Sequence, residues 1–187
     1  MQQADYLDGH LLVAMPGMGD PRFDHSVIYM CAHSPEGAMG LVVNKLADQI
    51  TFPDLLEQLN LPVASGTDNI QVHFGGPVEE SRGFVLHSND YAQDGSMPVD
   101  ENMALTASVE VLRAISSGEG PKMSLLALGY AGWGPGQLDA EIQANAWLHL
   151  ESNDDLVFGV DQERKWSQAV TMLGIDLTLL STTAGHA

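Results

Sequence analysis

The sequence of 187 residues has one cysteine, Cys31, and no long hydrophobic run. A single cysteine excludes an intrachain disulfide and a cysteine-based zinc cluster. No apolar segment approaches the roughly 18 residues that a membrane-spanning helix needs. The first ten residues, MQQADYLDGH, carry neither the basic nor the apolar segment of a signal peptide. We therefore expect a cytoplasmic protein with no membrane partner.

Basic residues are also scarce. Seven Lys and Arg stand against 25 Asp and Glu, which gives a net charge of −18. The stretch from Met123 to Glu163 contains no Lys or Arg but seven acidic residues. Nucleic-acid binding draws most of its affinity from cations that meet phosphates. We therefore expect no direct contact with nucleic acid, and solubility or a saline habitat is the ordinary explanation of such acidity.

The common catalytic motifs are missing too. The chain has no GxSxG, HExxH, CxxC or Walker sequence, and its seven histidines include no pair at i and i+4. The sequence therefore indicates no catalytic residue, no cofactor and no metal site.

Several apolar runs predict β-strands. The runs at 10–16, 27–33 and 39–45 predict three strands, of which the last two form a hairpin through a loop of about five residues. Two further strands are expected at 71–76 and 83–88, with a turn between them. The run 124–131 is apolar throughout and predicts a central strand. Short strands are expected at 147–151 and 155–160.

Other segments have helical periodicity. Leu55, Leu56 and Leu59 share a helix face that begins near Pro53. Further helices are expected at 108–118, from about Pro135 with Gly134 as N-cap, and at 161–174. Because helices and strands mix without a repeat or a linker, the sequence predicts a single α+β or mixed α/β domain.

Three stretches together resemble the YqgE/AlgH family of bacterial proteins. They are MPGMGDPRFDHSVIYMCAHSPEGAMGLVVN (15–44), HFGGPVEESRGFVLHS (73–88) and GYAGWGPGQLDAEI (129–142). The resemblance implies an α+β fold with a bent, bifurcated β-sheet folded towards a pseudo-barrel and flanked by helices. It implies one domain over 1–187 with a core at about 7–173, and we expect the tail at 181–187 to be flexible. It supplies no reaction, and the family name reflects a link to transcriptional regulation.

Cys31 and His33 are candidates for chemistry. They lie two residues apart in a predicted strand, so their side chains point to one face. Such a pair could be a nucleophile with its base or half of a metal site. A free cysteine in an apolar strand is more often a core residue, and we expect Cys31 to be buried and unreactive. His87, at a strand end, is expected to be half-exposed and structural.

Arg82 and the Gly-rich turns are candidates for binding. Arg82 is the only basic residue between Leu46 and Leu112, so it could form an internal ion pair or hold a ligand carboxylate. The loop after 124–131 could be a phosphate cradle or a simple elbow. Asp139 and Glu141 complement the helix dipole there and would repel phosphate, so we expect an elbow with Trp133 packed over it. The candidate ligand or partner site comprises Asp20, Phe23, Gly75, Gly76, Arg82, Gly132, Trp133, Gly134 and Gln137.

These observations favour a non-enzymatic binding or regulatory protein that acts through a protein partner or a small ligand. The link to transcription would then need no direct DNA contact. A ligand at the Gly-rich loop would be neutral or weakly polar and held by Gln137 and backbone donors. The alternative is an enzyme with an unrecognised site, such as a hydrolase that uses Cys31 or an acid with a nearby histidine. The sequence does not indicate the oligomeric state.

Overall fold

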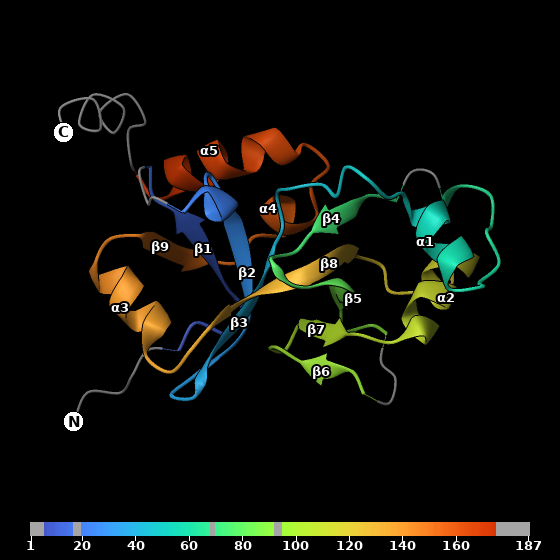
Figure 1. Ribbon diagram of the computed structural model, residues 1–187, viewed down its shortest axis with the longest axis horizontal. Coiled ribbons are helices and arrows are strands. Elements are labelled where there is room, and N and C mark those ends of the chain that lie inside the picture. Colours follow the sequence, from blue (N-terminus) through green and yellow to red (C-terminus); the bar gives the residue numbers. More distant parts are fainter. Residues whose placement is uncertain (1–5, 17–19, 68–69, 92–94, 175–187) are drawn as a thin grey trace.

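A nine-stranded sheet forms the centre of the computed structural model, which describes residues 6–16, 20–67, 70–91 and 95–174 (Figure 1). The tail at 181–187 lies outside the described residues. Eight strands follow one another in hydrogen-bonded order, and β4 pairs with β8 off this path. In that order the eight are β6 (Met97–Pro98), β7 (Met103–Thr106), β5 (Val78–Ser88), β8 (Ser124–Trp133), β3 (Gly37–Val42), β2 (Val27–Ser34), β1 (His10–Ala14) and β9 (Trp147–Glu151).

The sheet divides at the central strand β8. The first half of β8 pairs antiparallel with β5 and parallel with β4 (Val72–Phe74), whereas its last residues pair with β3. Gly129 marks the change, with a φ of 77° that glycine adopts without strain. A side chain at Gly75 would collide with the backbone of Gly129, and one at Gly76 would collide with Tyr130. These glycines therefore let β4 leave the sheet at the point where β3 joins it.

Helices cover the sheet in three places (Figure 1). Helices α4 (Asp154–Phe158) and α5 (Gln162–Met172) bury Leu156, Trp166 and Ala169 against one face of the sheet. Helices α1 (Phe52–Gln58) and α2 (Val109–Ser117) share a second core with strands β4, β5 and β8. Helix α3 (Gln137–Gln143) packs Leu138 against Trp133 and Trp147 in a third core. The curled, divided sheet and its helices confirm the predicted α+β class.

Local signals for several elements are confirmed. Pro53 lies in the first turn of α1, as predicted, and the structure adds a capping box between Thr51 and Asp54. Helix α2 begins after Ser108 and ends at Gly118, whose φ of 82° is left-handed. Strand β8 is central, as its apolar run predicts.

Four details of the expected structure are wrong. The segment 155–160 is not a strand, because the Asn153 side chain accepts from the N–H groups of Asp155 and Leu156 and begins helix α4. The expected turn at 77–82 belongs to β5, which bulges between Val78 and Gly83. The loop of the β2–β3 hairpin has two residues instead of five, since Ser34 pairs with Gly37. Helix α3 begins two residues later than expected, with Gly136 as its N-cap in place of Gly134.

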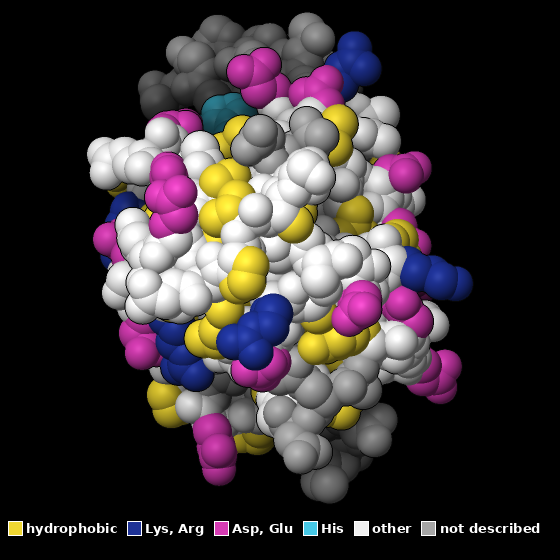
Figure 2. Space-filling view, turned by 90° about the vertical axis from the view of Figure 1, so that its right-hand side faces the viewer, with side chains coloured by type: hydrophobic (Ala, Val, Ile, Leu, Met, Phe, Trp, Pro, Cys, Tyr) yellow, Lys and Arg dark blue, Asp and Glu magenta, His cyan; other side chains and the backbone are white. Residues whose placement is uncertain are grey.

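The surface carries more acid than base. On the face formed by α1 and α2, Asp and Glu side chains are scattered among uncharged ones, with fewer Lys and Arg between them (Figure 2).

In the part of the chain that the structure describes, no helix has the length and apolar character required to span a bilayer.

Candidate functional site

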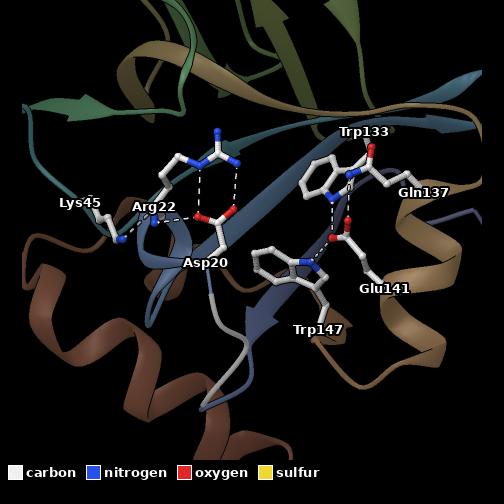
Figure 3. Close-up of polar contacts among 7 residues, drawn as sticks. All are labelled: Asp20, Arg22, Lys45, Trp133, Gln137, Glu141 and Trp147. Carbon is white, nitrogen blue, oxygen red and sulfur yellow. Dashed lines mark hydrogen bonds and ion pairs between the residues drawn. The ribbon is translucent and has the colours of Figure 1, made fainter.

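The short 3-10 helix η1 (Pro21–Phe23) is held by a bidentate ion pair (Figure 3). Asp20 caps η1 and accepts hydrogen bonds from the Arg22 backbone N–H at 3.0 Å, from Nε at 3.1 Å and from Nη2 at 2.8 Å. The bonds from Arg22 lower the pKa of Asp20. Lys45 adds a bond from its Nζ to the Arg22 carbonyl oxygen at 3.2 Å. Three of these bonds are internal to the η1 turn, and the bond from Lys45 connects η1 to the segment that follows β3.

A second polar network joins the end of β8 to α3 and β9. The Glu141 carboxylate oxygen Oε1 accepts from the Trp133 indole at 3.1 Å and from the Trp147 indole at 2.9 Å. Its other oxygen accepts from Gln137 Nε2 at 2.9 Å. Gln137 in turn accepts from the Gly134 N–H at 2.9 Å. Figure 3 shows the two indoles directed at this one carboxylate.

A cavity of about 280 Å³ lies between η1 and α3, and we call it the junction cavity. Its polar lining comes from Asp20, Arg22, Gln137 and Glu141, and its aromatic lining from Phe23 and Trp133. Phe23 packs edge-on against Trp147 at 5.7 Å between ring centroids. The cavity therefore combines a flat aromatic wall with hydrogen-bonding groups that already have partners.

The structure brings together five of the nine residues in the expected ligand or partner site. Those at the junction cavity are Asp20, Phe23, Gly132, Trp133 and Gln137. Arg82 lines a different hollow, which also reaches Gly132 and Trp133. Gly75 and Gly76 lie at the strand crossing, where they make room for backbone. Gly134 lies in the turn before α3 and does not line the junction cavity.

The Gly-rich loop has the geometry of an elbow. Trp133 is buried beneath it, the Gly134 N–H donates to the Gln137 side chain, and the Gln137 N–H donates to the Gly134 carbonyl. These two donors therefore point into the protein and not towards an anion. Helix α3 has seven residues, so its dipole is short.

Cys31 and His33 do not meet the junction cavity. Cys31 is 2% exposed, and burial raises the pKa of its thiol to about 12, so the thiolate form is disfavoured at neutral pH. His33 accepts from the Leu7 N–H at 3.1 Å, and its Nε2 lies 3.3 Å from an Asp139 carboxylate oxygen. Among the described residues, the hydrogen bond of Cys31 Sγ goes to the Tyr29 carbonyl oxygen and not to His33. The geometry gives no support to a Cys–His nucleophile.

Two other histidines have contacts that the structure defines. His87 is fully buried, not half-exposed, because its ring nitrogens bond to Thr106 Oγ1 at 2.7 Å and to the Ser88 carbonyl oxygen at 2.8 Å. His25 lies 2.9 Å from Asp24 Oδ1 on the surface, and its ring packs on Trp166 at 4.1 Å. Within the described residues, no group of three or more His, Cys, Asp or Glu could hold a metal ion.

Sequence reasoning missed four residues around the cavity. No sequence pattern singles out Arg22, Lys45 or Trp147, and for Glu141 the sequence predicts only a complement to the helix dipole. The spacing of Gln137 and Glu141, at i and i+4 on one helix, was a usable signal for their bond. The contacts of Glu141 with two indoles depend on how β9 returns beside β1, which no local pattern shows.

Comparison with known proteins shows which family the chain belongs to. The family model described as AlgH-like matches residues 11–178. This chain belongs to the AlgH-like family. It is 55% identical to a UPF0301 protein of Rhodospirillum rubrum over 97% of this chain and 95% of that one. It is 53% identical to a UPF0301 protein of Cereibacter sphaeroides over 97% and 99%.

Two solved structures have a similar fold. The solution structure of the AlgH protein from Pseudomonas aeruginosa matches with a TM-score of 0.80 and 42% identity over 100% of both chains. A crystal structure of a Corynebacterium diphtheriae protein matches with a TM-score of 0.73 and 22% identity over 97% of this chain and 94% of that one, a likeness of fold alone. Family membership therefore confirms the resemblance seen in the sequence.

Proposed function

We propose that this AlgH-like chain is a non-enzymatic binding protein that takes a small, net-neutral polar ligand in the junction cavity. The observation that carries the proposal is the convergence of η1, the end of β8 and α3 on one cavity. Asp20, Phe23, Trp133 and Gln137 come from segments more than a hundred residues apart in the sequence, yet line the same 280 Å³. Aromatic walls with a few fixed polar groups are typical of small-molecule sites.

The charges of the lining favour a neutral ligand. The guanidinium of Arg22 is already bonded to Asp20, so it offers an incoming anion less than a free arginine would. An anion would also approach two carboxylates, Asp20 and Glu141. A cation would find Glu141 already accepting three hydrogen bonds. An uncharged or zwitterionic molecule, stacked on Trp133 and bonded to Gln137, avoids both penalties.

The enzymatic alternative has less support. Its candidate nucleophile, Cys31, lies in the core and away from the cavity. A catalytic site needs a nucleophile or a general acid–base pair within reach of the bound molecule. The carboxylates at the cavity are held by Arg22 and by indoles, which is an arrangement suited to structure and recognition.

A regulatory role would act through protein contacts in the cytoplasm. With a net charge of −18 the whole molecule repels nucleic acid, so an effect on transcription requires an intermediary protein. Ligand occupancy at the junction of β8, α3 and η1 would change the surface that these elements present. A pull-down from native extract, with and without small metabolites, tests for such a partner.

Ligand binding is tested with a panel of small molecules and three proteins. Trp133 lies in the wall, so quenching of tryptophan fluorescence together with a rise in Tm reports occupancy. The panel compares uncharged polyols and amides, zwitterionic amino acids, and simple anions. Gln137→Ala is expected to abolish binding, and Gln143→Ala, an exposed residue on the same helix, is the matched control. Saturable binding that is equal in both variants would contradict the proposal, as would selective binding of anions.

A further inference from the structure

A second and larger hollow, which we call the split groove, lies where the sheet divides. Its volume is about 740 Å³, and it runs from the β2–β3 hairpin across β8 to β5, β6 and β7. Its apolar lining includes Met39, Val78, Phe84, Met97, Leu105 and Tyr130. A hollow of this size is within the range that small organic ligands occupy.

The split groove exposes apolar surface that a folded chain ordinarily covers. Val78 is 36% exposed and Met97 is 38% exposed, and both face the same hollow. Two methionines, Met39 and Met97, line it with flexible and polarisable side chains that adapt to ligands of different shape. An apolar molecule seated here would remove this surface from water.

One cation stands at this apolar surface. Among the described residues, Arg82 is the only Lys or Arg that lines the split groove, and its guanidinium lies 5.1 Å from the centroid of the Phe84 ring. The Phe84 ring in turn packs edge-on against Tyr130 at 5.7 Å. Stacking on an aromatic ring orients the planar guanidinium and leaves its N–H groups free to bind.

The ion pair that Arg82 makes within the protein is weak. Glu79 lies 3.6 Å from it, and the two side chains are 49% and 54% exposed. Exposed pairs of this kind contribute little to stability, so a ligand can replace the partner at small cost. Arg82 is therefore available to an anionic group that arrives with its own apolar body.

We propose that the split groove binds a free amphipathic monocarboxylate, with its carboxylate on Arg82 and its apolar body along Met39, Phe84 and Tyr130. A guanidinium matches one carboxylate through two parallel hydrogen bonds. A ligand with several negative charges is disfavoured, because Glu36 and Glu79 also line the groove and the chain carries a net charge of −18. The groove thus favours a ligand that has one negative charge and a long apolar body.

This site is separate from the junction cavity. Val78, Gly132 and Trp133 line both hollows, but Arg82, Met39 and Met97 line only the split groove. Substitution of Arg82 therefore tests the carboxylate site without touching Gln137 or Glu141. A negative result for the split groove therefore does not contradict ligand binding in the junction cavity, and the reverse also holds.

The experiment titrates the full chain with decanoate and follows binding by calorimetry and by NMR of methyl-labelled methionine. We expect one site per chain, with shifts of the Met39 and Met97 methyl groups and none at Met172, which lies on α5. Decanol, of the same length but uncharged, is expected to bind about tenfold or more weakly, since a hydrogen bond to a charged group is lost. Butyrate, which keeps the charge but lacks the apolar body, is expected to bind weakly as well.

Two variants and a matched control test whether the carboxylate of decanoate binds at Arg82. Arg82→Gln is expected to weaken decanoate binding about tenfold or more. Arg113→Gln is the control, because Arg113 is 56% exposed and pairs with Glu110 at 3.4 Å, on α2, away from the groove. Met97→Asp, at an exposed position, places a negative charge in the groove and is expected to weaken binding without unfolding the chain.

Three results would overturn the proposal. One is equal affinity of the parent chain and Arg82→Gln for decanoate. Another is equal binding of decanol and decanoate. The third is saturation by a peptide of alternating apolar and acidic residues with none by decanoate, which would make the groove a peptide site.

Discussion

Glu141 accepts the Trp133 indole N–H at 3.1 Å through the same carboxylate oxygen that accepts from Trp147 at 2.9 Å. Trp133 ends the central strand β8, and Trp147 begins the edge strand β9. The two rings contact each other edge-on at 6.0 Å. One carboxylate on α3 thus ties together two strands that are not neighbours in the sheet. The wall of the junction cavity depends on this arrangement.

Glu141→Ala is expected to lower the free energy of unfolding by about 2–4 kcal/mol, because two buried indole donors lose their acceptor. Glu141→Gln retains one carbonyl oxygen and is expected to cost less. Urea denaturation followed by tryptophan fluorescence measures both changes. Glu57→Ala, at an exposed position of α1, is the control, with an expected change within about 0.5 kcal/mol. A loss in Glu141→Ala no greater than in this control would show that the indoles find other partners.

Cys31 is expected to react slowly with thiol reagents in the native protein. It is 2% exposed within the largest core cluster, and burial raises its pKa to about 12. Labelling near neutral pH should approach the rate of the unfolded chain only when urea is added. Cys31→Ala should lower the free energy of unfolding by about 1 kcal/mol, as a small buried group is removed. Rapid native labelling would contradict this and would return attention to an enzymatic function.

Much of the fold could be predicted because its central elements have strong local signals. The run 124–131 is apolar throughout and becomes most of β8, while Gly118 marks the end of α2 and Pro53 marks the first turn of α1. The segment 155–160 was misassigned because five helical residues show too little periodicity to distinguish a helix from a strand. Asn153, a residue type that favours the N-cap position, is the local signal for this helix.

The site was predictable only in part, and the reason is distance along the chain. Trp133, Gln137 and the nearby glycines form a dense local motif that invites attention. Asp20 and Phe23 form a predicted turn, but their proximity to Trp133 follows from the sheet order, in which only β3 lies between β8 and β2, the strand that follows η1. The role of Trp147 depends on the return of β9 to pair with β1. Pairings between distant segments follow from tertiary packing, not from local composition.

Lys165 is expected to make stability rise with pH in the window from about 8 to 9. Its Nζ is buried and donates to the carbonyl oxygens of Val43 at 2.8 Å and Val157 at 2.9 Å. Burial lowers its pKa from 10.5 to about 8. The unfolded chain therefore holds this proton at a pH where the folded chain has released it, and the folded state gains about 1 kcal/mol over one pH unit.

The comparison with Lys165→Met isolates this contribution. Cys31 acts in the opposite direction above pH 9, because its folded pKa is raised, and Tyr29 does the same above pH 10. Both groups are common to parent and variant, so they cancel in the difference. His73, whose pKa is lowered to about 4, stays neutral throughout. A difference between parent and variant that stays constant from pH 7 to 9 would show that Lys165 keeps its proton.

The chain is expected not to bind DNA directly. Its net charge is −18, and the segment between Lys122 and Arg164 carries no base, so counterion release supplies little affinity. A fluorescence anisotropy titration with mixed-sequence duplex at about 50 mM salt should show no saturable binding below about 1 µM. Tighter binding that weakens as salt is added would contradict the expectation.

The Gly-rich loop is expected to behave as an elbow and not as a phosphate cradle. ATP, NAD, phosphate and sulfate, at low millimolar concentration and with ionic strength matched by chloride, should leave Tm unchanged. The Gly134 N–H already donates to Gln137, and Asp139 and Glu141 add negative charge beside it.

Alanine is expected to cost more stability at Gly136 than at Gly134, because the two glycines differ in backbone conformation. Gly136 has a φ of 73°, so Gly136→Ala should cost about 1 kcal/mol.

Gly134→Ala is the matched control, because a methyl group there meets only the Gln137 side chain at an ordinary contact distance of 3.8 Å. Its expected change in the free energy of unfolding is small. A rise in Tm of several degrees with ATP or NAD, lost in a folded Gly134→Val variant, would show that the loop binds phosphate. Such a result would mean that the Gly134 N–H leaves Gln137 when a ligand arrives, since both partners cannot share that donor in the geometry of the free chain.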